Sequence, residues 1–457
     1  MGEAIVSIDK LCYGGAGLGR LDGKACFVPF TAPGDRARIR IVKDKRSFLE
    51  GALLGLEVSS PLRVAPSCPA FGACGGCQWQ HLPYQEQLQA KGAIFSDSLR
   101  RIGRLEAGSI LPVAGSVQSF GYRSRIQLKH ARKNGVTLLG FFKSASHDII
   151  DIPYGCAIAS PLLNRIAGEL RPLLARLPEP EAIPQIDLSL GDDGESIAVL
   201  HFNGRSPLRL SERLRGARGD LPSLSGLFVL SAAAPAPAKS AGKGRPVPRL
   251  AGKRHLEHVF GIDALGYTVP AGLFPGSRQI RLRFSKGGFS QVNYPQNLEL
   301  IRTVWEWGGF TKRERVLDLY CGNGNISVPL ADSVAEVVGI EGYAPSIEDA
   351  AFNAAANGVE NASFQVSDAS LALGRLAKRG ELFDVVILDP PRGGAEAAAG
   401  IAALSPEKIL YISCDPATLA RDLSGLCQNG YRVTRCRPVD MFPQTYHLES
   451  VTELVRI

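Results

Sequence analysis

The chain has 457 residues, with 52 lysines and arginines against 44 aspartates and glutamates, which gives a formal net charge of +8. Hydrophobic residues make up 45% and charged residues 21% of the chain, so its composition is that of a folded protein of about three domains rather than a disordered one. No run of 18 apolar residues occurs, and residues 1–10 lack a basic stretch followed by an apolar one. We therefore expect no membrane segment and no secretion signal, and we place the chain in the cytoplasm. There, ten cysteines indicate metal ligands or reactive thiols rather than disulfides.

Residues 1–60 contain three short apolar segments, at residues 4–8, 25–29 and 37–42, which glycine-rich turns separate. Short strands at this spacing are typical of a small β-barrel, and we predict one here. Basic residues alternate with apolar ones in the third segment and follow it; they are Arg38, Arg40, Lys43, Lys45 and Arg46. They form either an ordinary solvent-exposed strand face or a patch that contacts phosphates, and the pattern favours neither.

Clustered cysteines mark the next region, residues 61–293, for which we predict a central α+β domain. Cys68, Cys74 and Cys77 lie on one glycine-rich loop, and Cys156 follows later. Four thiolates bind zinc or a 4Fe–4S cluster, and spacing alone does not choose between them. The spacing differs from the Cys-x3-Cys-x2-Cys pattern of radical-SAM proteins. We therefore expect a metal centre that is structural or helps to shape a nucleic-acid-binding surface, apart from the reaction site.

Two basic segments lie in the same central region. The first alternates with Ile126 and Leu128, and its basic residues are Arg123, Arg125, Lys129, Arg132 and Lys133. The second, residues 232–254, is rich in Ala, Pro, Lys and Gly, a composition that cannot form a core. We predict a strand with one solvated face for the first and a flexible basic loop for the second. The alternatives are that the first contacts phosphates or is an ordinary solvated strand, and that the second is a nucleic-acid-binding arm or a spacer.

From residue 294 to residue 457, helical patterns alternate with short apolar segments, which is typical of a doubly wound α/β domain. The predicted strands are residues 316–319, 337–340, 385–388 and 408–413. The predicted fold class is therefore α/β, with this doubly wound domain preceded by the barrel and by the central domain.

A glycine-rich turn, Asp318 to Asn325, follows the first of these strands. Its glycines let the backbone approach a ligand at the carboxyl edge of the sheet. Glu341 ends the next strand, where a carboxylate accepts hydrogen bonds from ribose hydroxyls. A nicotinamide cofactor fits the same logic, but the turn lacks the Gly-x-Gly-x-x-Gly spacing, and an aspartate before it suits a cationic amino group. The pattern therefore favours S-adenosylmethionine (SAM), with Asp368 either near the adenine or capping the next helix.

Reactive side chains follow two further strands. Asp389 and two prolines end the strand 385–388, and Arg392 stands where methyltransferases acting on base amines carry an aromatic residue. Cys414 follows the strand 408–413, and Glu449 lies near the start of a final strand. A thiolate that adds to carbon 6 of uracil makes carbon 5 nucleophilic, and a carboxylate can then remove the carbon-5 proton. Cysteine and glutamate beside SAM thus suit uracil-5 methylation, whereas a buried and inert thiol is the alternative interpretation of Cys414.

These motifs together resemble the RNA uracil-5 methyltransferases that carry an N-terminal TRAM domain and an iron–sulfur cluster, the ribosomal RNA 5-methyluridine group. The resemblance covers nearly the whole chain. Beyond the four cysteines and Glu341, it rests on Gly17–Arg20, Phe27–Pro29, Gln291–Asn293, Asp318–Asn325, Asp389–Arg392, Ser413–Cys414 and His447-x-Glu449.

The resemblance implies the role of each candidate residue. The implied SAM contacts are Gln291, Tyr320, Asn325, Glu341, Asp368 and Asp389. It also implies that Cys414 is the nucleophile, that Glu449 is the base and that Phe289 lies near the flipped base. The implied ligands of a 4Fe–4S cluster are Cys68, Cys74, Cys77 and Cys156. The protein would then be a monomeric cytoplasmic enzyme that methylates an extruded uridine of 23S ribosomal RNA.

One residue departs from the family pattern. Asp415 stands where the family commonly has asparagine, and an extra carboxylate beside the thiol is expected to raise the pKa of Cys414 and slow its attack. Two alternatives therefore stay open. In the first, the substrate is a tRNA rather than 23S ribosomal RNA. In the second, the chain is a catalytically inactive iron–sulfur protein that binds RNA or assists assembly.

Overall fold

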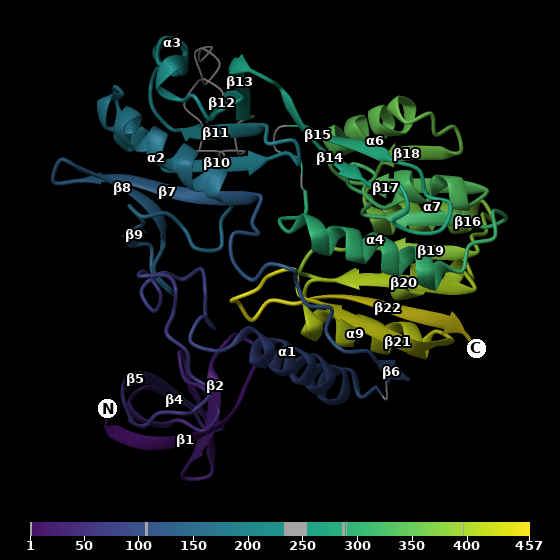
Figure 1. Cartoon of the computed structure of the whole chain (residues 1–457). Helices are drawn as coiled ribbons and strands as arrows, with labels where there is room; N and C mark the ends of the chain where they lie inside the picture. Colours follow the sequence, from purple (N-terminus) through teal and green to yellow (C-terminus); the bar gives the residue numbers. More distant parts are fainter. Residues whose placement is uncertain (1, 106–107, 233–253, 286–287, 289, 396) are drawn as a thin grey trace, which may run out of the picture. The chain divides into compact units, whose positions relative to one another are not determined.

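The N-terminal strands close into a five-stranded barrel in the order β1-β2-β3-β5-β4 (Figure 1). The strands are β1 (Glu3–Leu11), β2 (Gly17–Leu21), β3 (Lys24–Val28), β4 (Arg36–Asp44) and β5 (Phe48–Val58). Side chains alternate across β4, so Ala37 and Ile39 are buried in the barrel core while the arginines between them are exposed. The predicted barrel is confirmed. The sequence pattern missed β2 because its glycines indicate a turn; in the barrel, a Cβ on Gly17 would lie 2.1 Å from the hydroxyl of Thr31.

The computed structural model describes all residues except 1, 106–107, 233–253, 286–287, 289 and 396. The chain forms two units, the first made of Met1–Gly72, Cys77–Tyr122 and Gly266–Ile457, and the second of Ala73–Gly76 and Arg123–Leu265. Nearly all of the predicted basic loop 232–254, and Phe289, lie outside the described residues. Across the described part of the chain, no helix combines the length and the apolar character needed to cross a membrane.

An eight-stranded sheet in the order β18-β17-β16-β19-β20-β22-β21-β6 forms the largest part of the first unit (Figure 1). Its strands are β6 (Ser109–Ile110), β16 (Arg315–Leu319), β17 (Glu336–Glu341), β18 (Ala362–Val366), β19 (Val385–Leu388), β20 (Lys408–Ser413), β21 (Tyr431–Val439) and β22 (Glu449–Arg456). All four strands predicted for this domain are present. Strands β16 to β20 are parallel, and β22 runs antiparallel between β20 and β21.

Helix α4 (Tyr294–Gly308) precedes the parallel strands, and α9 (Pro416–Gln428) leads from β20 to β21. The helices that connect the parallel strands are α5 (Ser327–Leu330), η4 (Ala331–Ser333), α6 (Ala344–Ala356), α7 (Ala369–Lys378) and α8 (Ala398–Ala403). A two-stranded sheet of β14 (Ala264–Val269) and β15 (Ile280–Ser285) precedes them. Because β17 and β18 lie on one side of β16 and β19 and β20 on the other, the strand order reverses next to β16. Doubly wound sheets bind ligands at the carboxyl edge of this position.

Helix α1 (Tyr84–Ser98), with the π-helical turn η1 (Leu99–Gly103), packs on the same sheet through Phe95 and Leu99. Its buried face also carries a charge. The ammonium of Lys91 donates to Asp440 at 2.5 Å and to the carbonyl of Phe442 at 3.0 Å, and both charged side chains are fully buried. The pair ties α1 to the segment 440–448, which leads from β21 to Glu449.

Breaking this buried ion pair is expected to destabilise the protein strongly. Lys91→Met leaves the carboxylate of Asp440 buried without its cation, and such a loss costs about 3–5 kcal/mol of unfolding free energy. Lys10→Met is the matched control, because it breaks the exposed Lys10–Asp97 pair, which is expected to contribute less than about 1 kcal/mol. Urea unfolding followed by circular dichroism measures both variants. Equal effects in the two would show that burial of the Lys91 pair has no special cost.

The second unit is built on a seven-stranded sheet in the order β13-β12-β11-β10-β7-β8-β9. Its strands are β7 (Arg125–Lys133), β8 (Val136–Phe142), β9 (Ile149–Asp151), β10 (Gln185–Leu190), β11 (Ser196–Phe202), β12 (Gly226–Ala232) and β13 (Arg254–Gly261). Its helices are α2 (Pro161–Arg176), η2 (Pro180–Ala182), α3 (Pro207–Gly216) and η3 (Arg218–Asp220). In β7, Ile126 and Leu128 are buried and Arg132 and Lys133 are exposed, as the alternating pattern predicts.

Candidate active site

The turn after β16 holds its backbone in an unusual conformation. Tyr320 has a φ of +64°, and Gly322 and Gly324 have φ values of +56° and +80°. A Cβ on Gly324 would lie 2.8 Å from Val328, so this position requires glycine. The amide of Tyr320 donates to the carbonyl of Ile340 at 2.8 Å, which fixes the turn to the end of β17. A non-glycine residue at positive φ is strained, and such strain is found where a binding site requires it.

Asp318, the residue before this turn, is almost completely buried in β16. Its carboxylate accepts a hydrogen bond from the hydroxyl of Ser327. Burial, and then the nearby carboxylates of Asp389 and Glu341, raises the pKa of Asp318 to about 7. Burial raises the pKa of Asp389 to a similar value. Three carboxyl groups from β16, from β17 and from the end of β19 therefore converge, and a cation placed among them would be stabilised.

Tyr320 lies beside two of the predicted ligand-binding carboxylates. Burial, together with Asp368 and Glu341, raises the pKa of the Tyr320 hydroxyl, so these groups lie near it. Asp368 caps α7 by accepting a hydrogen bond from the amide of Leu371 at 3.1 Å. The capping interpretation of Asp368 is thus confirmed, and its contact with adenine stays a prediction. Glu341 accepts from the amide of Tyr343 through one carboxylate oxygen, at 2.7 Å.

Strand pairing brings Cys414 and Glu449 together. Ser413, the last residue of β20, pairs with Ser450 of β22. Because the two strands are antiparallel, Cys414, which follows Ser413, and Glu449, which precedes Ser450, are neighbours at the same end of the pair. Burial, then Glu449 and Asp389, raises the pKa of Cys414 to about 12, and Arg392 opposes this rise. The thiol is half-buried rather than fully buried, and it lies at the same edge as the acidic group.

Glu449 carries an unsatisfied buried oxygen. Its side chain is only 4% exposed, and within the described residues its Oε2 atom has no hydrogen-bond partner. Burial and the neighbouring Asp389 hold the pKa of Glu449 well above its ordinary value, and Arg392 partly offsets this. A buried, unpartnered carboxyl beside a thiol is poised to exchange a proton with a ligand.

Asp415 is held by donors from two elements. One of its carboxylate oxygens accepts hydrogen bonds from the amides of Ala417 and Thr418, at 2.9 and 3.0 Å, and so caps α9. The other accepts from the hydroxyl of Tyr13. Three donors thus hold this charge, and the expected effect of Asp415 on the reactivity of Cys414 stays a prediction.

Gln291 and Asn325, the remaining predicted SAM contacts, lie beside helix α4. Gln291 is half-buried shortly before α4 begins. The side-chain amides of Asn325 and Asn297 bond each other at 2.8 and 2.9 Å, and Asn325 also accepts from the hydroxyl of Tyr267. Sequence reasoning missed Asn297, although a polar residue on the apolar face of α4, one turn before Leu300, was a usable signal.

The four predicted cluster ligands belong to both units. Cys68 and Cys77 fall in the first unit, and Cys74 and Cys156 fall in the second. The amide of Gly76 donates to the sulfur of Cys74 at 3.4 Å. Considering only residues that the structure describes, no three side chains of His, Cys, Asp or Glu come together as a metal site.

The strand order and the converging acidic groups define the class of protein. A doubly wound sheet with an antiparallel strand between its last two long strands, and with carboxylates at the switch point next to β16, is the architecture of SAM-dependent methyltransferases. A cysteine, Cys414, lies at the same edge.

Comparisons with known proteins place the chain more closely. Residues 3–54 match the TRAM domain, and residues 269–457 match the tRNA (uracil-5-)-methyltransferase family. The 23S rRNA (uracil(1939)-C(5))-methyltransferase RlmD of Alkalilimnicola ehrlichii is 34% identical over 99% of this chain and 96% of that protein. An uncharacterised RNA methyltransferase of Thermosynechococcus vestitus is 35% identical over 98% of this chain and 96% of its own.

A solved structure shares the whole architecture. The tRNA (uracil-54, C5)-methyltransferase of Pyrococcus abyssi, in complex with S-adenosyl-L-homocysteine, has a TM-score of 0.71 and 25% identity, and it covers 99% of this chain and 100% of its own. The chain therefore belongs to the family of SAM-dependent RNA (uracil-5-)-methyltransferases with a TRAM domain. The family resemblance and the predicted fold class are confirmed.

Proposed function

We propose that this protein transfers a methyl group from SAM to carbon 5 of a uridine in 23S ribosomal RNA. The observation that carries the proposal is the pairing of Cys414 with the buried Glu449 next to the acidic group around Asp318. Full-length relatives named as 23S rRNA uracil-5 methyltransferases support the choice of substrate. The proposed place of action is the cytoplasm, and the proposed active form is the monomer.

The acidic group suits the donor. SAM supplies an electrophilic methyl group on a cationic sulfonium, and it also carries an ammonium group. We assign its binding to residues around the turn after β16 and at the neighbouring strand ends, namely Gln291, Tyr320, Asn325, Glu341, Asp368 and Asp389. A bound cation stabilises the ionised forms of the carboxyls whose pKa is raised in its absence. Donor binding is therefore expected to ionise Asp318 and Asp389 at neutral pH.

In the proposed reaction, Cys414 acts as the nucleophile and Glu449 as the general base. The sulfur of Cys414 adds to carbon 6 of the uracil, and the electron pair of the ring double bond allows carbon 5 to take the methyl group, with the donor leaving as its neutral thioether. Glu449 removes the proton from carbon 5, the double bond forms again, and the bond between carbon 6 and sulfur breaks. The unpartnered oxygen of Glu449 is the atom available to receive this proton.

Methyl transfer from labelled SAM tests the function and separates its alternatives. Unmodified 23S rRNA and unmodified tRNA are offered separately, and the labelled nucleoside is identified by mass spectrometry. We expect 5-methyluridine in 23S rRNA only. Label in tRNA alone would establish the tRNA alternative, and SAM binding without transfer to either RNA would favour the inactive RNA-binding alternative.

We propose further that Cys68, Cys74, Cys77 and Cys156 hold a 4Fe–4S cluster. Their chemistry fits, because four thiolates satisfy such a cluster and an amide N–H already donates to the sulfur of Cys74, an interaction that favours the thiolate form. The proposed role of the cluster is structural, apart from the methyl transfer.

The variant Cys74→Ser is expected to lose the brown colour and visible absorbance that anaerobically prepared wild-type protein shows. Cys12→Ala is the control, because Cys12 is a half-buried cysteine of the barrel outside the ligand set. Iron and sulfide analysis measures the occupancy of each. A colourless wild-type protein containing zinc would contradict the assignment.

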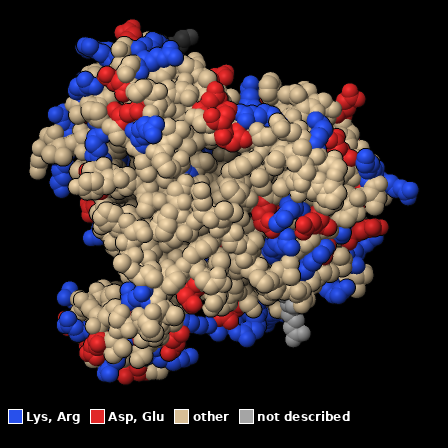
Figure 2. Space-filling view, in the orientation of Figure 1, with Lys and Arg blue, Asp and Glu red and all other residues tan. Residues whose placement is uncertain are grey.

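We propose that basic residues of the barrel contact RNA phosphates. Some of these residues form ion pairs within the barrel. Arg38 pairs with Glu3 at 3.6 Å, and Lys43 pairs with Glu50 at 2.8 Å. Figure 2 shows blue and red atoms interspersed over the barrel, in agreement with this pairing. In the described residues, Arg40, Lys45 and Arg46 form no ion pair, so we assign the salt-sensitive contacts to these three.

A further inference from the structure

The turn between β1 and β2 of the barrel reaches the loop that carries the nucleophile. The hydroxyl of Tyr13, in this turn, donates to the carboxylate of Asp415, the residue directly after Cys414. Burial and the Asp415 carboxylate raise the pKa of Tyr13, so the phenol keeps its proton and remains a donor. One side chain of the barrel thus contacts the nucleophile loop directly.

Tyr13 also contacts the segment that leads to the proposed base. Its ring packs edge-on against Tyr446 with a centroid distance of 5.4 Å, and the ring of Tyr446 lies 4.2 Å from that of His447. Glu449 follows two residues after His447 and begins β22. Both chain segments that supply the reactive pair therefore have contact, directly or through one ring, with the same tyrosine.

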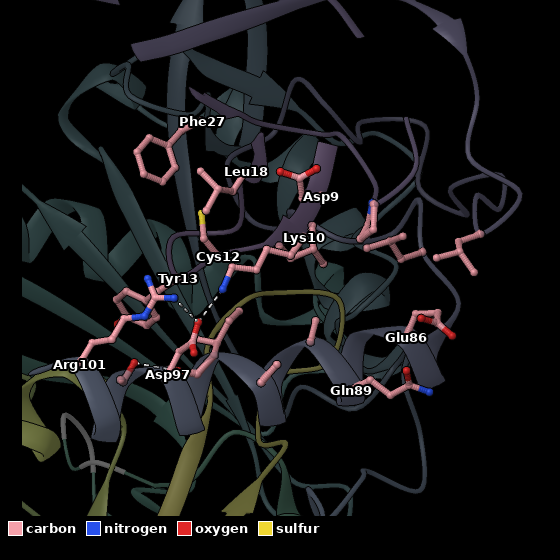
Figure 3. Close-up of a pocket in the computed structure, with 18 of the residues that line it drawn as sticks. Asp9, Lys10, Cys12, Tyr13, Leu18, Phe27, Glu86, Gln89, Asp97 and Arg101 are labelled. Atoms are coloured by element: carbon pink, nitrogen blue, oxygen red, sulfur yellow. Dashed lines mark hydrogen bonds and ion pairs between the residues drawn. The ribbon is translucent and has the colours of Figure 1, made fainter. Parts of the chain in front are cut away.

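A cavity of about 440 Å³ lies between the barrel and α1, with Cys12, Leu18 and Phe27 on its barrel side and Glu86 on α1 (Figure 3). The exposed pair between Lys10 and Asp97 bridges it. The turn itself is fixed, because the indole N–H of Trp79 donates to the carbonyl of Gly15 at 3.0 Å and Leu11 packs with Trp79 in a buried cluster. The turn therefore holds Tyr13 in a defined place.

We propose that Tyr13 is a positioning residue for Cys414, acting by holding Asp415 in its capping conformation at the start of α9. This inference rests on the proposed function, since it assigns a role in the same reaction. The amides of Ala417 and Thr418 bind one oxygen of Asp415, and Tyr13 is the donor to the other. Without Tyr13, that oxygen is released and the charge can turn toward Cys414, where it opposes thiolate formation.

Tyr13→Phe tests the proposal, because it removes the hydroxyl and keeps the ring that packs on Tyr446. The single-turnover rate of methyl transfer is expected to fall about tenfold, as for the loss of one hydrogen bond to a charged group. The KM values for SAM and RNA should not change, and the pH–rate profile should move to higher pH. Lys10→Met is the matched control: it breaks an ion pair between the barrel and α1 without touching Asp415, and its rate should equal that of wild type.

Asp415→Asn separates positioning from a general loss of structure. Asparagine still caps α9 through its carbonyl oxygen but carries no charge, so adding Tyr13→Phe to this variant should have little further effect. An undiminished rate in Tyr13→Phe, the same fall in Lys10→Met, or a full tenfold fall in the Asp415→Asn background would each overturn the inference. Absence of transfer by the wild-type protein would instead remove the proposed function itself.

Discussion

We expect that replacing Cys414 by alanine abolishes methyl transfer while SAM binding is retained. The reason is chemical: without the sulfur adduct at carbon 6, carbon 5 of uracil is too weak a nucleophile to take the methyl group. A loss of at least about 10⁴-fold is expected, as for other nucleophiles whose removal leaves only binding and positioning. Labelled SAM with 23S rRNA measures the transfer, and calorimetry measures SAM binding. Cys427→Ala, a half-buried cysteine on α9, is the control and should keep full activity.

The same thiol predicts the pH dependence. Its pKa is raised to about 12 by burial and by the carboxylates of Glu449 and Asp389, so at neutral pH the thiol form dominates. Raising the pH increases the thiolate fraction, and the rate of adduct formation should therefore rise with pH through the neutral range. Activity in Cys414→Ala, or a rate that falls as pH rises from 6 to 8, would contradict the assignment of the nucleophile.

The variant Glu449→Gln is expected to trap the RNA on the protein. Glutamine nearly matches the size of glutamate but cannot accept the carbon-5 proton, so the sulfur adduct and the methyl transfer proceed while elimination stalls. The covalent RNA–protein complex should be visible as a shifted band on a denaturing gel, and turnover should fall by about 10²–10⁴-fold, the usual contribution of a general base.

A neighbouring glutamate provides the control for this trap. Glu453 lies on the same strand, β22, and is also buried, but its carboxylate pairs with Arg435 at 2.9 Å. Glu453→Gln should lower stability without accumulating an adduct. Release of product by Glu449→Gln at the wild-type rate would show that another group removes the proton. In that case Asp389, whose pKa is also raised, is the next candidate.

The local sequence pattern was sufficient to predict the parallel strands and the residues at their ends. A run of apolar residues that ends in a polar one indicates a buried strand reaching the sheet edge, and parallel strands all end at the same edge. Asp318, Glu341, Asp389 and Cys414 could therefore be placed together without knowledge of the packing. Indeed, Asp389 and Glu341 both contribute to the raised pKa of Asp318, and Asp389 also contributes to that of Cys414.

Pairings between segments that are distant in the sequence could not be predicted from local pattern. The insertion of β22 between β20 and β21, with Ser413 opposite Ser450, is what places Glu449 beside Cys414. Nothing in the periodicity of either strand specifies its neighbour. The same is true of Lys91, which is a good helix residue in any sequence and becomes a buried ion in this fold because Asp440 approaches it.

The amino-acid sequence by itself determined the class of fold, the family and the residue types needed for a methyl transfer to carbon, because these depend on short-range pattern and on the identity of side chains at strand ends. Only the tertiary structure decided which groups perturb one another. Asp415, predicted from the sequence to act on its neighbouring thiol, also caps α9 and accepts from Tyr13, a residue far away in the sequence. The physical reason is that the effect of a charge depends on its donors and its direction, and both are set by the folded chain.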